Sequence, residues 1–124
     1  MVKISNKILI MKELSQIKDY ASKNSVPIMF DEGIEFIIDY IKKNDVGFIL
    51  EIGTAIGYSA IKFAQINPNI RVFTIEYDIE RYQKAVENIT KLNLDDQITV
   101  FLGDALKFDF TEKLQSIITF IEGA

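Results

Sequence analysis

The stretch Phe48-Ile-Leu-Glu-Ile-Gly-Thr-Ala-Ile-Gly-Tyr-Ser59 decides the fold of this chain. Its first part, Phe48 to Ile52, is an apolar run that predicts a buried strand. Gly53 breaks this strand, and a helix is expected to begin around Gly57. A strand, a glycine turn and a helix in this order are typical of the nucleotide site of a parallel α/β sheet, since glycine lets the backbone approach a ligand closely.

Two details of this stretch narrow the class of ligand. The spacing is Gly-x-x-x-Gly, which differs from the Gly-x-Gly-x-x-Gly fingerprint of dinucleotide sites. The carboxylate of Glu51, just before Gly53, would repel a pyrophosphate and would suit a cation such as the ammonium group of a methionine tail. The stretch therefore favours S-adenosylmethionine over a nicotinamide cofactor.

Composition limits the remaining chemistry. The 124 residues are 48% hydrophobic and 26% charged, as expected of one globular domain spanning 1–124. The sequence has no cysteine and no histidine, which excludes disulfides, thiolate metal sites and histidine as a general base. A net charge of -4 disfavours non-specific binding to nucleic acid. We read no signal peptide and no membrane helix, and expect a cytoplasmic protein.

Helices and strands alternate along the chain. Strands are expected at 48–52, 71–76, 98–102 and 117–121. Helices are expected at 8–21, 31–44, 58–66 and 79–92, with one helical turn at 111–115. Ser5 or Asn6, Asp31 and Asp78 are the expected N-caps of the first, second and fourth helices. This alternation predicts an α/β fold with about four parallel strands flanked by helices.

The ends of the four expected strands all carry acidic residues or glycine. They are Glu51–Gly57, Glu76–Tyr77, Gly103–Ala105 and Glu122–Gly123. Ligands of parallel sheets bind at the carboxyl ends of strands, so these segments predict one shared site.

Two of these segments suggest contacts to an adenosine. Glu76 lies about 20 residues beyond Gly53, where a carboxylate accepts hydrogen bonds from ribose hydroxyls; the alternative is a solvated charge at a strand end. Asp104 can accept a hydrogen bond from the exocyclic amine of adenine while the Ala105 N–H faces a ring nitrogen. The alternative for Asp104 is an ordinary turn residue.

Three further residues keep two interpretations each. Ser59 bonds either the cofactor carboxylate or its own helix backbone. Met29 either covers a bound ligand or fills the core. Glu122 is either a ligand of a hard cation such as Mg²⁺ or an exposed charge.

Taken together, these motifs resemble a known family. The segments Glu51-Ile-Gly53-Thr-Ala-Ile-Gly57-Tyr-Ser59, Glu76, Gly103-Asp104-Ala105 and Phe120-Ile-Glu122 look like those of the class I S-adenosylmethionine-dependent O-methyltransferases of the catechol and caffeoyl-CoA type. The segment Val26-Pro-Ile-Met29 is similar to the bacterial branch that methylates 5-hydroxyuridine in tRNA.

The resemblance implies a Rossmann-like sheet, S-adenosylmethionine as cofactor and a hydroxylated acceptor, either a tRNA wobble uridine or a small molecule. It implies that Met29 and Ser59 contact the methionine moiety, Glu76 the ribose, and Asp104 and Ala105 the adenine. Glu122 matches a position that contacts the cofactor and binds Mg²⁺. The resemblance names no catalytic residue.

The family fold is longer than this chain, so we expect the N-terminal half of the fold only. A half-sheet leaves an apolar edge, which predicts self-association into a homo-oligomer. One alternative function is therefore a non-catalytic interaction module that dimerises through this edge. Another, an NAD-dependent oxidoreductase, is disfavoured by Glu51 and by the glycine spacing.

Overall fold

Three parallel strands form the sheet at the centre of the fold. A computed structural model describes residues 2–107 of the chain, with side chains from residue 7 onward. The strands pair in the order β1-β2-β3, and they are β1 (Phe48–Ile52), β2 (Arg71–Glu76) and β3 (Ile98–Leu102). These bounds agree with the predicted ones. The strand expected at 117–121, the turn expected at 111–115 and Glu122 lie outside the described residues.

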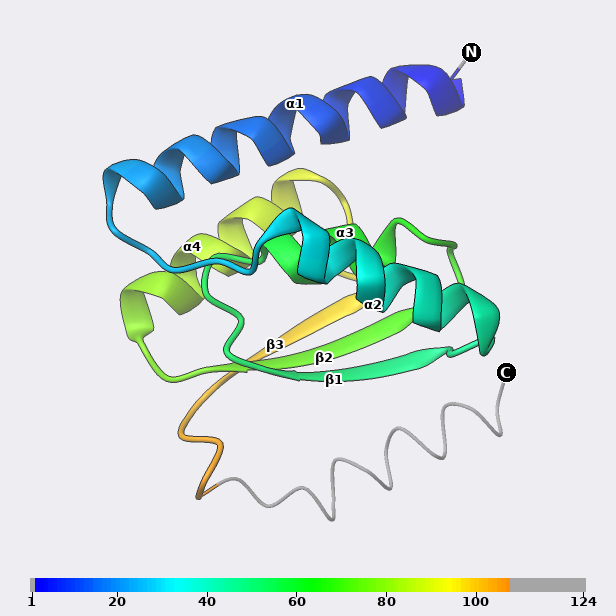
Figure 1. Cartoon of the computed structure of the whole chain (residues 1–124). Coiled ribbons are helices and arrows are strands. Elements are labelled where there is room, and N and C mark those ends of the chain that lie inside the picture. Colours follow the sequence, from blue (N-terminus) through cyan, green and yellow to red (C-terminus); the bar gives the residue numbers. More distant parts are fainter. Residues whose placement is uncertain (1, 108–124) are drawn as a thin grey trace.

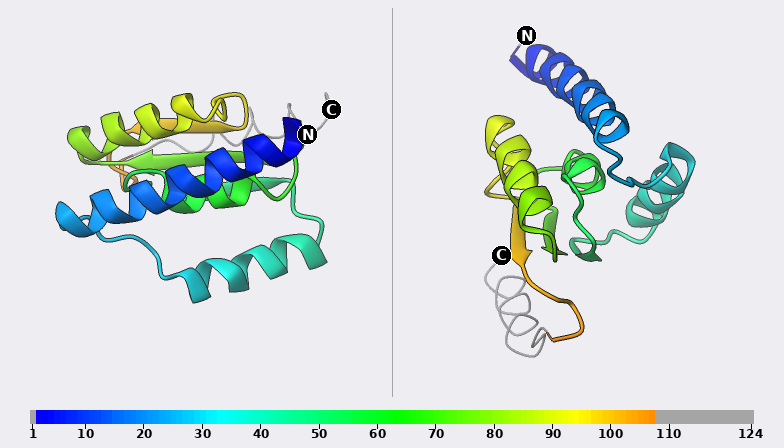
Figure 2. Two further views of the ribbon diagram at one scale, coloured as in Figure 1. Left: turned by 90° about the horizontal axis from the view of Figure 1, so that it is seen from above. Right: turned by 90° about the vertical axis from the view of Figure 1, so that its left-hand side faces the viewer.

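Helices of the described part lie on one side of this sheet (Figure 1, Figure 2). They are α1 (Val2–Lys23), α2 (Asp31–Lys43), α3 (Tyr58–Ala64) and α4 (Ile79–Lys91). α3 packs on β2 and α4 on β3, whereas α1 and α2 both contact α3. The predicted α/β class is thus confirmed, with α3 at the centre of the helical layer.

One of the predicted helix caps is confirmed and two are wrong. Asp78 caps α4, since its Oδ1 accepts a hydrogen bond from the Arg81 N–H at 3.0 Å. In α2 the N-cap is Phe30, because the Asp31 carboxylate binds side chains of other helices instead of the backbone. α1 begins already at Val2, so Ser5 and Asn6 lie within the helix.

The core lies between the sheet and the helices, where aliphatic side chains exclude water and supply most of the driving force for folding. Its completely buried members include Ile34, Ile56, Ile61, Ile70 and Val72.

β1 is only partly buried and exposes alternate side chains, contrary to the prediction of a buried strand. Ile49 packs against the core, but Leu50 and Ile52 on the other face are 43% and 65% exposed. On that face, the rings of Phe73 and Phe101 stack with centroids 6.1 Å apart. The prediction was wrong because the helices of the described part cover only one face of the sheet. Successive side chains of a strand point to opposite faces, so every second residue of β1 points away from the helices.

None of the helices within residues 2–107 is long and apolar enough to cross a membrane. The cytoplasmic location expected from the sequence stays a prediction.

Candidate functional site

The turn after β1 combines three residues in the left-handed region of φ. They are Gly53 (φ 91°), Ala55 (φ 51°) and Gly57 (φ 93°). The N–H groups of Gly53 and Thr54 both donate to the Ile75 carbonyl of β2, at 2.8 and 3.1 Å. A Cβ at Gly53 would meet no described atom within 4 Å. The turn is therefore fixed to the sheet on one side and leaves open space on the other.

Glu76, the last residue of β2, joins its strand to this turn. Its Oε1 accepts a hydrogen bond from the Ala55 N–H at 2.7 Å, and its Oε2 accepts one from the Asp78 N–H at 3.0 Å. The side chain is buried. A carboxylate has about four acceptor positions, so each oxygen can accept a further bond, as a ribose hydroxyl would supply.

Glu51 lies at the centre of a chain of hydroxyl groups. Ser59 donates a hydrogen bond to Glu51 Oε2, and the Thr74 hydroxyl donates to Oε1 at 2.8 Å. The Thr54 and Thr74 hydroxyl oxygens are 2.6 Å apart. Because Thr74 has one hydroxyl proton and gives it to Glu51, Thr54 must be the donor in the second contact. The hydroxyl of Ser59 thus donates to Glu51, and its expected contact with the cofactor carboxylate stays a prediction.

Burial raises the pKa of the Glu51 carboxyl, because desolvation penalises its charged form. The hydrogen bonds from Ser59 and Thr74 oppose this rise in pKa, whereas the nearby charge of Glu76 adds to it. A partly buried carboxylate of this kind gains from a cation as partner and would disfavour a pyrophosphate. This electrostatic setting argues against the NAD alternative.

A cavity of about 160 Å³ brings four of the predicted residues together. Met29 lines it from the segment before α2, and Glu51, Gly53 and Ser59 line it from β1, the turn and α3. Gly57 ends the same turn. Glu76 accepts a hydrogen bond from the N–H of Ala55, which is another residue that lines the cavity. The cavity is therefore lined by the end of the first strand, its turn and the Met29 segment, whereas Gly57 and Glu76 contact the turn without lining the cavity.

The loop after β3 lies beside Glu76, since the Gly103 N–H donates to the Glu76 carbonyl at 2.9 Å. Asp104 Oδ1 accepts a hydrogen bond from the Leu106 N–H at 2.9 Å, as in an ordinary aspartate turn. Asp104 and Ala105 are not among the described residues lining the 160 Å³ cavity. Their contact with adenine stays a prediction.

Sequence reasoning missed the residues that support the turn. Thr54 and Thr74 complete the hydroxyl chain to Glu51, and the amide Nδ2 of Asn88 in α4 donates to the Ile56 carbonyl at 2.9 Å. All three are buried. The sequence does carry a signal for Thr74 and Asn88. Each is a polar residue at a position where the spacing of apolar residues along the strand or helix predicts burial, and a buried polar side chain needs a hydrogen-bond partner.

The part of the chain that the structure describes holds no group of three or more acidic, histidine or cysteine side chains that could bind a metal ion. The expected Mg²⁺ is therefore not supported there, and Glu122, its expected ligand, lies outside this part.

A parallel sheet whose first strand ends in a glycine turn, and whose second ends in a carboxylate bonded to that turn, is the arrangement typical of nucleoside-binding α/β proteins. The comparison of sequences makes this class specific. The sequence model of the O-methyltransferase family matches residues 2–117, and the chain belongs to this family.

Two solved structures and one curated protein that are similar to this chain are O-methyltransferases by name. A caffeoyl-CoA O-methyltransferase-like structure from Staphylococcus aureus is 34% identical with a TM-score of 0.73, over 84% of this chain and 53% of that one. An O-methyltransferase from Bacillus cereus, solved with S-adenosylhomocysteine, is 28% identical with a TM-score of 0.69, over 87% of this chain and 48% of that one. O-methyltransferase imqG of Aspergillus flavus is 44% identical over 57 residues, which are 46% of this chain and 23% of that protein. The chain thus spans about half the length of the solved structures that it matches, and less of this curated relative.

Proposed function

We propose that this chain binds S-adenosylmethionine at the turn after β1, as the cofactor-binding part of an enzyme that methylates a hydroxyl group. The observation that carries the proposal is the partly buried, hydroxyl-bonded Glu51 carboxylate beside a turn that Glu76 holds from the next strand. Family membership and the S-adenosylhomocysteine bound to the Bacillus cereus protein support it.

Each predicted residue receives a role in this proposal. Glu51 faces the ammonium group of the methionine tail, Met29 covers that tail, and Ser59 orients Glu51. Glu76 accepts hydrogen bonds from the ribose hydroxyls, and Asp104 with Ala105 holds the adenine.

When bound, S-adenosylmethionine supplies a methyl group on a positively charged sulfur. The residues of the cavity bind this group and fix its direction, which contributes to catalysis by removing translational and rotational freedom before the reaction. Within residues 2–107 we assign no general base, so the described residues account for binding and orientation.

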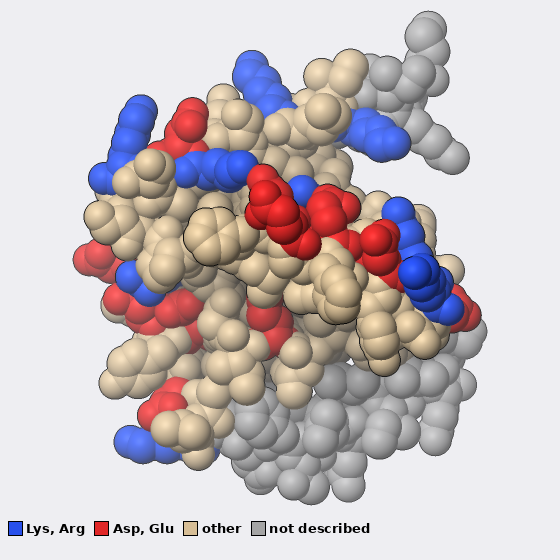
Figure 3. Space-filling view, in the orientation of Figure 1, with Lys and Arg blue, Asp and Glu red and all other residues tan. Residues whose placement is uncertain are grey.

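The acceptor follows from the surface charge. Acidic side chains run along α2 on the face shown in Figure 3, and they are Asp31, Glu32, Glu35 and Asp39. Asp31 and Glu35 on this face are paired with Lys18 and Lys62, so the choice of acceptor rests on the net charge of -4, which disfavours the phosphates of tRNA. A catechol-like small molecule is therefore favoured over 5-hydroxyuridine of tRNA. Incubation with labelled S-adenosylmethionine and either acceptor tests this choice, and label transferred to tRNA would reverse it.

Calorimetry with S-adenosylhomocysteine tests cofactor binding. Glu76→Gln and Glu51→Gln each keep the size of the side chain but lose its charge, and each should weaken binding about tenfold or more. Asp39→Asn, on the exposed side of α2, is the matched control and should bind as the wild type does. If both site variants gave the wild-type heat, the assignment of Glu51 and Glu76 would be wrong.

A second candidate is a non-catalytic module that dimerises through its open sheet edge, and the exposed Leu50 and Ile52 favour it because β1 is an edge strand of the described sheet. Sedimentation equilibrium over a range of concentrations tests it, with Ile52→Lys as the variant that should abolish association. A stable dimer that binds no S-adenosylhomocysteine would replace the first proposal, whereas a monomer at high concentration would eliminate the second.

A further inference from the structure

The segment between α1 and α2 forms one wall of the cofactor cavity and has few backbone contacts of its own. The Val26 N–H donates to the Ala21 carbonyl at 2.9 Å, and the next backbone bond along the chain joins the Ile34 N–H to the Phe30 carbonyl at 3.1 Å. Between these two bonds lie 27–29, the residues that line the cavity from this side. Other contacts must therefore hold this wall in place.

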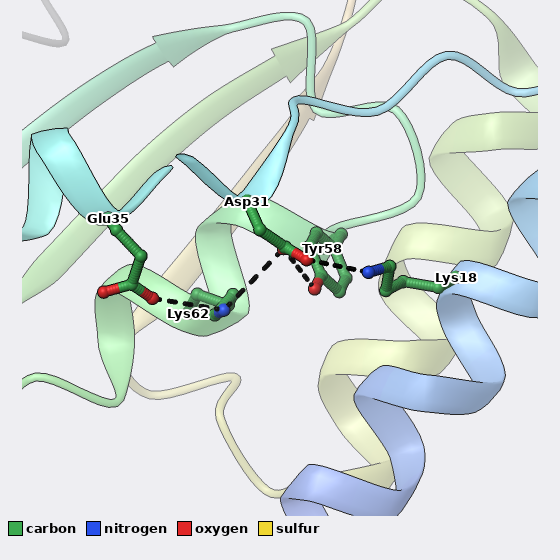
Figure 4. Close-up of polar contacts among 5 residues, drawn as sticks. All are labelled: Lys18, Asp31, Glu35, Tyr58 and Lys62. Carbon is green, nitrogen blue, oxygen red and sulfur yellow. Dashed lines mark hydrogen bonds and ion pairs between the residues drawn. The ribbon is translucent and has the colours of Figure 1, made fainter. Parts of the chain in front are cut away.

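Asp31, the residue directly after this segment, makes such contacts (Figure 4). Its Oδ1 accepts a hydrogen bond from the Tyr58 hydroxyl at 2.8 Å, and its Oδ2 accepts one from Lys18 Nζ at 2.7 Å. Lys62 Nζ lies 3.9 Å from Oδ1. The hydrogen bonds from Lys18 and Tyr58 lower the pKa of Asp31, so the carboxylate is charged at neutral pH. One side chain thus joins α1, α2 and α3.

Tyr58 belongs to the opposite wall of the cavity. It follows Gly57, the left-handed residue that begins α3, and it lines the cavity itself. Its side chain is 4% exposed, and the ammonium groups of Lys18 and Lys62 lie 6.0 and 5.7 Å from the ring centroid. Packing and charge therefore fix the position of its hydroxyl group.

We propose that the hydrogen bond between Asp31 and Tyr58 is a clasp that holds the Met29 segment over the cofactor cavity. Asp31 and Tyr58 are then positioning residues that set cofactor affinity through the segment. This inference rests on the proposed function, because it names what keeps the proposed site closed. Without the clasp, the glycine turn and the Met29 segment lose the side-chain hydrogen bond that joins them, and the ligand must order the wall as it binds.

Binding of S-adenosylhomocysteine to the full chain tests the clasp. Tyr58→Phe keeps the ring and removes the hydroxyl, so affinity should fall about tenfold, the value of one hydrogen bond to a charged acceptor. Asp31→Ala should match it, and Asp31→Asn, which keeps an acceptor for Tyr58, should recover part of the loss. Glu35→Gln removes only the pair between Glu35 and Lys62, and should leave affinity unchanged.

A double variant shows whether the clasp acts through the segment. If it does, Tyr58→Phe should weaken binding far less in a Met29→Ala chain than in the wild type. In the Met29→Ala chain, the segment that the clasp positions has already lost its side-chain contact with the ligand. Equal losses in both chains would mean that Tyr58 acts by another route and would overturn the proposal.

Hydrogen exchange of the ligand-free chain gives a readout that does not depend on the cofactor. Tyr58→Phe should speed exchange of the hydrogen-bonded amides that flank the segment, Val26 and Ile34, and of the Gly57 amide in the glycine turn, and leave α4 as it is in the wild type. Unchanged exchange at these three amides overturns the clasp, whether or not the chain binds ligand. Faster exchange in a chain that never binds S-adenosylhomocysteine would confirm the clasp as a structural contact and reject both the proposed function and the role in affinity.

Discussion

Replacing Thr74 by valine should be unusually costly for a change of nearly equal shape. Thr74 lies in the middle of β2 with no exposed surface, and its hydroxyl donates to Glu51 while accepting from Thr54. Valine fits the strand and its neighbours but removes both hydrogen bonds. Glu51 then keeps one hydroxyl donor, Ser59, and the Thr54 hydroxyl, in a residue only 1% exposed, loses its acceptor.

The size of the effect follows from these two bonds. A hydrogen bond to a charged group contributes about 1.5–3 kcal/mol, and a buried hydroxyl left without a partner costs about 1–3 kcal/mol. Since the two losses share one site and partial relaxation is expected, we predict that the free energy of unfolding falls by about 2–4 kcal/mol at neutral pH.

Urea titration followed by circular dichroism measures this change. Thr99→Val in the adjacent β3 is the matched control, because Thr99 is exposed and the same substitution there should stay within about 0.5 kcal/mol. The loss at Thr74 should shrink as the pH falls through the raised pKa of Glu51, since a protonated carboxyl depends less on a donor. If the two valine variants were equally stable, the proposed chain of hydroxyls would be refuted.

Three further predictions use other parts of the site. Gly53→Ala places a Cβ at a φ of 91° and should lower the free energy of unfolding, measured in urea, by about 1–2 kcal/mol. The same Cβ enters the open side of the turn, so the variant should also bind S-adenosylhomocysteine more weakly in calorimetry. The pKa of Glu51 is raised on folding, so at pH values between its unfolded and folded pKa the folded chain holds a proton that the unfolded chain has lost. The free energy of unfolding of the ligand-free chain should therefore fall as the pH rises through this window. Urea titrations of Glu51→Gln at the same pH values should show no such fall. Asp78→Ala removes the cap that binds the Arg81 N–H and should cost about 0.5–2 kcal/mol, measured by thermal unfolding, whereas Asp78→Asn should keep most of the stability.

The strands could be predicted from the sequence because local patterns determine them. β1, β2 and β3 have the bounds that their β-forming residues predicted, and Gly53 and Gly57 occupy left-handed positions that favour glycine. The position of Glu76 beside the turn followed from a spacing that parallel sheets share.

What the sequence could not supply is the choice of partner by each polar side chain. Asp31 has the residue type of an N-cap, but tertiary packing brings Lys18 and Tyr58 to it, and these contacts decide its role. Ser59 likewise turns to Glu51, a partner eight residues away on another element. Such choices depend on how the elements dock, which periodicity does not encode.

The strand order has a consequence for how the chain acquires its shape. In the part of the chain that the structure describes, β2 and β3 each lie beside the strand that precedes them in the sequence, and each pair is joined through a single helix. Such pairs span a shorter stretch of sequence than the pairs of a sheet whose order skips strands, and shorter separations favour faster folding. On the ribosome, where synthesis proceeds from the N-terminus, β1, α3 and β2 can assemble first and present a finished template before β3 has been translated.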